Sequence, residues 1–221
     1  MQAILFDLDG TLTASGPGII KSVQYALEKM GCPEPDTRKL RFFIGPPLEE
    51  SMRRFRHFTH QEAIQAVNYY HDYYRKNGVF DNQLYPGVTH LLKSLAATEL
   101  QVAVASSKPE VFVRQILEHY HLTQYFDQIV GASLDGQQRV GKAAVIEEAL
   151  RRLGMTNSRN QVLMVGDTDN DIDGAQQERI AGWGVSYGYG TVQELQTAGA
   201  QVIVNDVPTL ERKLIKLKPE S

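Results

Sequence analysis

Two carboxylates, Asp7 and Asp9, stand at the end of a short apolar run near the start of the chain. The run Ala3–Phe6 has four consecutive apolar residues, which predicts a strand buried on both faces. Because side chains alternate along an extended chain, Asp7 and Asp9 leave it on the same side, and Gly10 then allows a tight turn. Two crowded carboxylates repel each other and each is stabilised by a cation or a proton. The pair favours a catalytic site, although Asp and Gly also end strands in ordinary turns.

Other side chains capable of chemistry follow later apolar runs. Two hydroxyls and a lysine follow the run 102–105, an acidic segment follows the run 162–165, and a further lysine begins a helical segment between them. These residues are Ser106, Ser107, Lys108, Lys142, Asp167 and Asp171. Ligands of open parallel sheets bind beyond the carboxyl ends of the strands. We therefore expect these residues to join Asp7, Asp9 and Thr11 in one site.

This set of side chains contains no histidine. All six histidines lie in predicted helical segments or loops away from strand ends, where we expect surface or packing positions: His57, His60, His71, His90, His119 and His121. Without His or a suitable Cys, oxygen ligands favour Mg²⁺ over a transition metal. A hard dication together with hydroxyl, amide and lysine donors suits a phosphate dianion.

The bulk properties are those of an ordinary globular protein. The chain has 221 residues, of which 42% are hydrophobic and 22% charged, and a net charge of −3. This balance gives no electrostatic case for a nucleic-acid or membrane partner. The single cysteine, Cys32, suits a reducing compartment, and no apolar run approaches the roughly 20 residues of a membrane span. Since no signal peptide precedes Asp7, we expect a soluble, cytoplasmic protein.

Strands and helices alternate along most of the chain. Five short apolar runs predict buried strands at 3–6, 102–105, 128–130, 162–165 and 202–204. Helical stripes lie between them, for example Val88 to Leu95, Val111 to Leu117 and Ala143 to Leu153. This alternation predicts an α/β fold, a doubly wound parallel sheet with helices on both faces.

A segment of successive helices interrupts this pattern. Residues 14–83 predict helices at roughly 18–30, 48–58 and 60–76 with no buried strand between them, so the first two core strands lie far further apart than the roughly 30 residues of a strand–helix–strand step. We expect an α/β core of residues 1–13 and 84–221 and a helical cap of residues 14–83, placed to act as a lid. In its third helix, we expect a stripe of core packing: Ala63, Ile64, Val67, Tyr70 and Tyr74.

Four short motifs now identify a family resemblance. Asp7-x-Asp9-Gly-Thr11, Ser106, Lys142 and Gly166-Asp167-x-x-x-Asp171 resemble, in order, the four motifs of the haloacid dehalogenase-like (HAD) phosphohydrolases. The resemblance covers essentially the whole chain. It extends to a helical cap after the first motif, as in the phosphoglycolate phosphatase-like branch, to which segments 43–48 and 182–190 are also similar.

The resemblance implies a mechanism and a set of roles. Asp7 attacks phosphorus to form an aspartyl-phosphate, and Asp9 acts as general acid and then general base. The Mg²⁺ cofactor is held by Asp7, the backbone carbonyl of Asp9 and Asp167, with Asp171 beside it, directly or through water. Ser106 bonds a phosphoryl oxygen, and Lys142 offsets the charge of Asp7 and the phosphate.

Other positions are expected to bind substrate. These are Thr11, Ser107, Lys108 and the cap residue Gly45, although Thr11 also suits a turn cap and Ser107 and Lys108 also suit solvent-facing positions. Specificity is expected from the loop 44–48 and from Arg41 or Arg53. Ala14 stands where relatives commonly carry an acidic residue, so contacts at the hinge are expected to differ. The resemblance favours phosphoglycolate or a nucleoside monophosphate as the small phosphorylated substrate.

Four other functions compete with a phosphatase. A phosphosugar mutase shares the chemistry, and a phosphonate hydrolase needs a cap lysine in an apolar setting, which the sequence lacks. A signalling receiver domain is shorter and has no helical insertion. A catalytically silent binding protein on the same fold disagrees with the intact Asp7, Asp9, Lys142 and Asp167. A phosphatase is the simplest interpretation.

Overall fold

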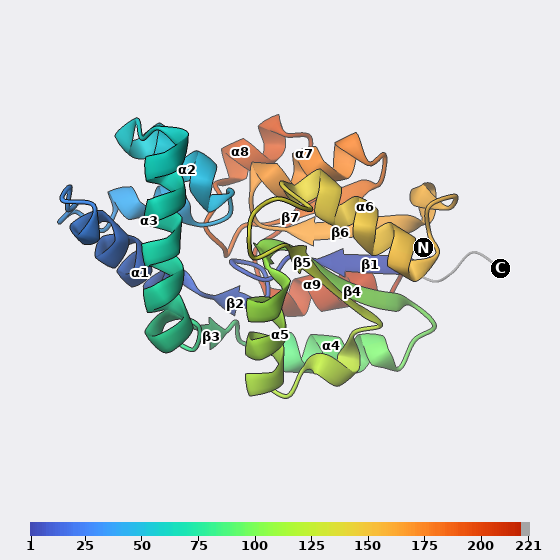
Figure 1. Cartoon of the computed structure of the whole chain (residues 1–221). Helices are drawn as coiled ribbons and strands as arrows, with labels where there is room; N and C mark the ends of the chain where they lie inside the picture. The colour runs from blue at the N-terminus through green and yellow to red at the C-terminus, as the bar shows by residue number, and fades with distance from the viewer. Residues whose placement is uncertain (218–221) are drawn as a thin grey trace.

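The computed structural model describes residues 1–217 and contains a six-stranded parallel sheet with helices on both faces (Figure 1). The strand order is β5-β4-β1-β6-β7-β8. The strands are β1 Ala3–Phe6, β4 Gln101–Pro109, β5 Gln128–Ala132, β6 Val162–Gly166, β7 Ala181–Val185 and β8 Val202–Val204. The doubly wound α/β sheet expected from the sequence is confirmed.

The two faces of β1 pack against different helices. Ile4 and Phe6 belong to the core that includes α4 (Val88–Ala96), α5 (Glu110–His119) and α9 (Val207–Leu214). Ala3 and Leu5 belong to the core formed with α6 (Lys142–Leu153) and α7 (Asp169–Gln177). The shorter α8 (Val192–Thr197) packs against α7. Burial on both faces explains why β1 is uniformly apolar.

The strand β7 was not predicted, because its sequence Ala-Gly-Trp-Gly-Val does not form an apolar run. Its glycines allow close helix packing instead of supplying apolar area. A Cβ at Gly184 would lie 2.9 Å from Leu195 Cδ1 of α8, and one at Gly182 would lie 3.3 Å from Ile172 Cδ1 of α7. The glycines of β7 allow α7 and α8 to pack closely on the strand, and a hydrophobicity pattern carries no information about such packing.

The register of the central strands brings the motif residues to one edge. Ala3 of β1 pairs with Gln101 on one side and Val162 on the other. Phe6 pairs likewise with Val104 and Val165, and the Asp7 N–H continues the ladder to the Val165 carbonyl at 2.9 Å. β1 and β6 therefore end at nearly the same level of the sheet, whereas β4 continues beyond them to Pro109, so that Ser106, Ser107 and Lys108 lie within the strand and not after it as expected.

A helical segment separates β1 from α4 and lies to one side of the sheet (Figure 1). Its helices are α1 (Gly16–Lys29), α2 (Leu48–Arg56) and α3 (His60–Tyr73), with a 3-10 turn at Lys39–Phe43 and a π-helical turn at Tyr74–Gly78. Its two linkers pair as a short antiparallel ribbon of β2 (Thr13–Ala14) and β3 (Gln83–Leu84). We call residues 14–83 the cap.

Short 3-10 turns at Thr123–Tyr125 and Arg159–Gln161 complete the structure, and no helix formed by residues 1–217 is long and apolar enough to cross a membrane. Two predicted packing positions are wrong. Val111, in the first turn of α5, and Ile64, in the middle of α3, are each 42% exposed. Phe112 takes the buried place next to Val111, whereas Ile64 faces a cavity described below.

Candidate active site

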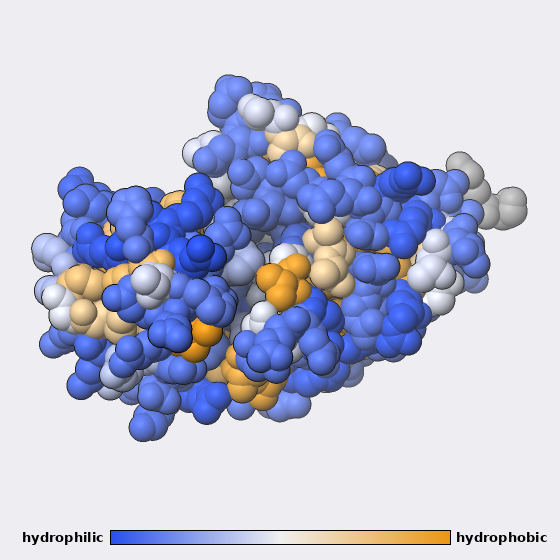
Figure 2. All heavy atoms as spheres, turned by 45° about the horizontal axis from the view of Figure 1, so that its top comes forward, coloured by the Kyte–Doolittle hydropathy of each residue, from blue (hydrophilic) through white to orange (hydrophobic). Residues whose placement is uncertain are grey.

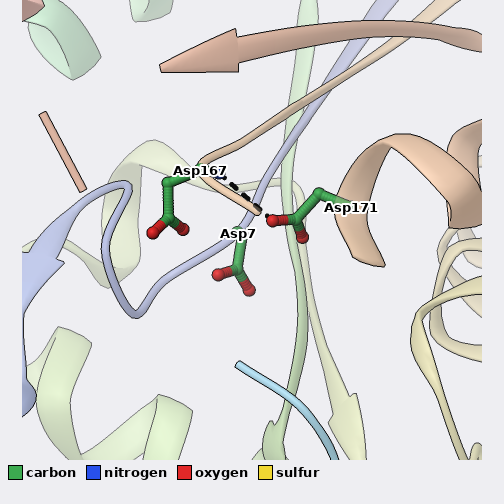
Figure 3. A group of neighbouring side chains, drawn as sticks. All are labelled: Asp7, Asp167 and Asp171. Atoms are coloured by element: carbon green, nitrogen blue, oxygen red, sulfur yellow. Dashed lines mark hydrogen bonds between the residues drawn. The ribbon is translucent and has the colours of Figure 1, made fainter. Parts of the chain in front are cut away.

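Three buried aspartates meet where the sheet strands end (Figure 3). Asp7 follows β1, Asp167 follows β6, and Asp171 lies in the first turn of α7. One carboxylate oxygen from each lies within 4.8 Å of the others, and none of the three residues is more than 5% exposed. The three carboxylates lie close together, so each raises the electrostatic cost of ionising its neighbours.

Lys142, the first residue of α6, lies inside this cluster. Its Nζ is 2.7 Å from Asp7 Oδ1 and 2.7 Å from Asp171 Oδ1, and it donates to the Ala105 carbonyl at 3.0 Å. Burial lowers the pKa of Lys142, but the carboxylates of Asp171 and Asp7 outweigh it and hold the pKa above its usual value. Lys142 is therefore a permanent positive charge beside Asp7.

Asp171 stabilises the loop that carries Asp167. Its Oδ2 accepts hydrogen bonds from the Asp167 N–H at 3.1 Å, the Thr168 N–H at 3.0 Å and Thr168 Oγ1 at 2.9 Å (Figure 3, first of these). Since a Cβ at Gly166 would lie 2.2 Å from Asp171 Cγ, only glycine fits there. Asp171 Oδ1 forms the ion pair with Lys142 and accepts no hydrogen bond within residues 1–217.

Asp167 is enclosed by the loop that follows β7. Asp167 Oδ2 accepts the Tyr189 N–H at 2.7 Å, and Asp167 Oδ1 accepts Thr11 Oγ1 at 3.3 Å. A Cβ at Gly10 would lie 2.0 Å from Asp167 Oδ2, and a Cβ at Gly188 2.4 Å from it. No role was predicted for Tyr189 or Gly188. The sequence feature that could have indicated their place beside Asp167 is the glycine-rich segment 182–190.

A second buried ion pair joins Asp9 to Lys108. Lys108 Nζ is 2.7 Å from Asp9 Oδ2 and lies 4.7 Å from the centre of the Tyr74 ring of the cap. Lys108 is 9% exposed, so it is not a solvent-facing residue. Among residues 1–217, Asp9 Oδ1 is buried and accepts no hydrogen bond.

The charge balance of the buried site is negative. Burial raises the pKa of Asp7 to about 6, with further contributions from Asp171 and Asp9 against the opposing effect of Lys142. Burial, Asp171 and Asp7 likewise raise the pKa of Asp167. When all four carboxylates (Asp7, Asp9, Asp167 and Asp171) are ionised, they exceed the two ammonium groups (Lys108 and Lys142) by two negative charges. A divalent cation with oxygen ligands fits both the charge and the donors.

A cavity of about 950 Å³ opens above this site between the cap and the core. Asp9 and Lys108 line it together with Ser107 and Gly45. The wall is mainly apolar and includes Phe43, Phe58, Ile64, Val67, Tyr70, Phe112, Leu134 and Val140. Figure 2 shows apolar side chains beside the hollow between the two parts of the molecule. The size and lining are typical of a site for a small organic molecule.

Of the remaining predicted residues, some line this cavity and others do not. Arg53 and the buried His71 line it, whereas Arg41 is an exposed residue of the 3-10 turn. Ser106 is 1% exposed within β4, and its Oγ accepts the Lys108 N–H at 3.4 Å. Thr11 is fully buried against Asp167. The predicted packing stripe of residues 63–74 is only partly core. Tyr74, in the π-helical turn after α3, is fully buried, whereas Ile64, Val67 and Tyr70 line the cavity.

Comparison with known proteins agrees with this geometry. The sequence model of the family described as "Haloacid dehalogenase-like hydrolase" matches residues 4–185. The chain belongs to this family. A "5'-nucleotidase" of Pseudomonas aeruginosa is 40% identical over 193 residues, which are 87% of this chain and 86% of the relative. A "Phosphoglycolate phosphatase" of Yersinia pestis is 30% identical over 203 residues, which cover 90% of this chain and 86% of that protein.

Two further relatives widen the comparison. The HAD chain is 36% identical to "Tyrosine-protein kinase PtkA" of Mycobacterium tuberculosis over 204 residues, 92% of this chain and 68% of that protein. The crystal structure of a predicted phosphatase from Clostridium acetobutylicum superposes with a TM-score of 0.93 at 43% identity and covers 97% of this chain and 98% of its own. The expected family is confirmed, and the chain is an enzyme, a HAD phosphatase.

Proposed function

We propose that this HAD enzyme is a Mg²⁺-dependent phosphomonoester hydrolase that forms an aspartyl-phosphate on Asp7. The observation that carries this proposal is the position of Asp7, whose Oδ1 is 2.7 Å from Lys142 Nζ inside an acidic cluster. Lys142 fixes one Asp7 oxygen and balances the negative charge that accumulates when a phosphate approaches.

The reaction has two displacement steps. In the first, a bond forms between an Asp7 carboxylate oxygen and phosphorus while the bond from phosphorus to the leaving oxygen breaks. Asp9 delivers the proton that the leaving alkoxide requires. In the second, water attacks phosphorus, Asp9 takes its proton, and the bond between phosphorus and Asp7 breaks to release inorganic phosphate.

Asp9 has the geometry for this proton transfer. Its Oδ2 is held by Lys108 at 2.7 Å, so the carboxylate cannot rotate freely. Its Oδ1 accepts no hydrogen bond within residues 1–217, and Asp9 lines the cavity where the leaving group would lie. We assign Oδ1 as the atom that gives and takes the proton. Ser106 and Ser107, in the C-terminal half of β4, would bond phosphoryl oxygens.

Asp7 and Asp167 are the residues that would hold Mg²⁺, together with the backbone carbonyl of Asp9. Their all-oxygen donor set and the two excess negative charges support this assignment. Asp171 lies beside them, with its Oδ1 paired to Lys142 and its Oδ2 bonded to the Asp167 loop, and would contact the ion directly or through water. When bound, Mg²⁺ supplies charge neutralisation and alignment of the phosphoryl group.

The cavity favours a nucleoside monophosphate over phosphoglycolate as substrate. Glycolate is a two-carbon acid, whereas the cavity measures about 950 Å³ and has an aromatic and aliphatic wall. A flat nucleobase can bury its faces against such a wall, with Arg53 near polar edges. The "5'-nucleotidase" of P. aeruginosa, 40% identical, supports the same choice.

Phosphate release from nucleoside monophosphates and from 2-phosphoglycolate tests the proposal. We expect turnover that requires Mg²⁺, disappears with EDTA, and favours the nucleotides by kcat/KM. Asp7→Asn abolishes it, whereas Asp173→Asn, an exposed aspartate of α7, leaves it unchanged. Preference for 2-phosphoglycolate would overturn the substrate assignment alone. Absence of turnover with every ester, by a folded protein, would overturn the phosphatase mechanism.

A further inference from the structure

Tyr189, in the loop between β7 and α8, contacts both the acidic cluster and the cap. Its backbone N–H donates to Asp167 Oδ2 at 2.7 Å. Its phenol oxygen accepts the backbone N–H of Gly16, the first residue of α1, at 2.5 Å. One residue therefore connects a carboxylate of the active site with the first helix of the cap, 173 residues away in sequence.

In the first turn of α1, the Gly18 N–H donates to the Asp81 carbonyl at 3.0 Å, whereas the Gly16 N–H has no acceptor within the cap. The first N–H groups of a helix have no partner within the helix, and a side chain just before it usually accepts one of them. Here the preceding Ser15 makes no such hydrogen bond, and Ala14 has no polar side chain. The acceptor for Gly16 comes from Tyr189, in the core.

Tyr189 is held tightly at both ends. A Cβ at Gly16 would lie 3.0 Å from the phenol oxygen and 3.2 Å from Cε1 of the ring. Gly188 and Gly190 press the neighbouring backbone against Asp167, since a Cβ at Gly190 would lie 2.2 Å from the Asp167 carbonyl oxygen. Because interiors at this density transmit small displacements, a shift of α1 is felt by the Asp167 loop.

The same loop also reaches the second linker of the cap. The ring of Tyr187 packs edge-on against Tyr85, just after β3, with centroids 4.8 Å apart, and its hydroxyl donates to the Thr11 carbonyl at 3.0 Å. The Tyr85 N–H donates to the Leu12 carbonyl at 3.1 Å. Both linkers are therefore tied to one short segment of the core.

We propose that Tyr189 is a positioning residue whose phenol oxygen fixes the orientation of the cap over the cavity. This inference rests on the proposed function, because the cap supplies most of the wall that contacts the leaving group. Removal of the hydroxyl weakens recognition of a large leaving group. It leaves the phosphoryl chemistry intact, because the backbone N–H to Asp167 is retained.

Tyr189→Phe, assayed with two phosphate donors, tests the proposal. We expect kcat/KM for adenosine monophosphate to fall roughly fivefold to tenfold, mainly through KM, as for the loss of one hydrogen bond. Acetyl phosphate, whose leaving group is too small to span the cavity, and the Mg²⁺ concentration for half-maximal activity should change by less than about twofold. Tyr125→Phe, which removes a phenol oxygen in the 3-10 turn after α5, is the matched control.

Gly16→Ala approaches the same contact from the cap side. Its new Cβ presses on the Tyr189 ring, so the same selective rise in KM for adenosine monophosphate is expected. In the double variant, the two effects should not add, because both disturb one contact. Equal losses with both donors in Tyr189→Phe would mean that the Asp167 loop is damaged, and would overturn the proposal.

Hydrogen exchange at the Gly16 amide, followed by NMR, reads the contact without any substrate. We expect exchange at least about tenfold faster in Tyr189→Phe than in the wild type or Tyr125→Phe, because the amide loses its acceptor. Unchanged exchange would overturn the proposal. If the wild type hydrolyses neither donor, the phosphatase function fails, whereas the amide measurement still decides whether Tyr189 anchors the cap.

Discussion

Lys108 Nζ lies 2.7 Å from Asp9 Oδ2 in a pair buried beneath the Tyr74 ring of the cap. The pair is separate from that of Lys142 and Asp7, so each of the two carboxylates of the first motif has its own lysine. Burial lowers the pKa of Lys108, but Asp9, Tyr70 and Asp7 together raise it above its usual value. Lys108 therefore remains charged and holds Asp9 in place.

Replacement of Lys108 by Met should damage both stability and activity. It leaves the Asp9 carboxylate buried without its cation, which typically costs about 3 kcal/mol of unfolding free energy. We expect kcat to fall at least about tenfold, since Asp9 loses its fixed orientation. Chemical denaturation and steady-state kinetics measure the two effects. Lys93→Met, on an exposed position of α4, is the control, and equal behaviour of the two variants would contradict the role of Lys108.

Asp7→Asn should inactivate the enzyme and yet stabilise it when no metal is present. Burial raises the pKa of Asp7 from 3.8 to about 6, so the folded state binds a proton more tightly than the unfolded state. Ionisation then costs stability as pH rises through this window, and the cost is complete above about pH 6. In EDTA at pH 8, the variant should unfold at a free energy about 1–3 kcal/mol higher than the wild type.

The advantage of Asp7→Asn should disappear below about pH 4, where Asp7 is protonated in both states. Denaturant unfolding at pH 4 and pH 8 makes the comparison. Asp173→Asn, on the exposed side of α7, should show no such pH-dependent difference. A destabilised Asp7→Asn at pH 8 would show that the Lys142 pair outweighs the cost of burial.

Magnesium should stabilise the folded enzyme through Asp167. A ligand that binds only the folded state adds about 2.7 kcal/mol at a concentration 100 times its Kd. We expect Mg²⁺ to raise the melting temperature of the wild type and to leave that of Asp167→Asn unchanged. The control Asp169→Asn, which changes the exposed first residue of α7 two positions after Asp167, should respond like the wild type. An equal response of Asp167→Asn would place the metal elsewhere.

His71 should make the cap sensitive to acid. Burial, Arg75 and Lys108 lower its pKa from 6.5 to about 4, so the unfolded state binds the proton more readily between these values. Stability is therefore complete above about pH 6.5 and falls as pH decreases toward 4, by up to about 3 kcal/mol. His71→Phe should fill the place between Tyr70 and Phe112 and flatten this dependence.

Urea unfolding of wild type and His71→Phe at pH 4.5 and pH 7.5 measures the effect. The exposed His57, which begins a loop after α2, offers a control in His57→Gln. If His71→Phe loses as much stability as the wild type on acidification, other groups of the protein account for the loss.

The local sequence determined the core strands of this protein and the edge of the sheet at which the site lies. The apolar runs at 3–6 and 162–165 could be recognised because strands buried on both faces need apolar residues at every position. The loops that follow such strands meet at one edge of a parallel sheet, so Asp7, Asp9 and Asp167 could be brought together without coordinates. The strand Ala181–Val185 could not be recognised, because its glycines allow close packing of the neighbouring helices and add no apolar run to the sequence.

Tertiary structure alone decided which charges meet and what surrounds them. Lys108 could face solvent or the site by its sequence, and only the fold puts it on Asp9 under Tyr74. The contact of Tyr189 with Gly16 and the cavity wall also join segments from opposite ends of the chain. A periodic pattern indicates which face of a helix or strand is buried, but not which other element packs against that face. Contacts between distant segments depend on how the cap docks on the sheet, and no local rule contains that information.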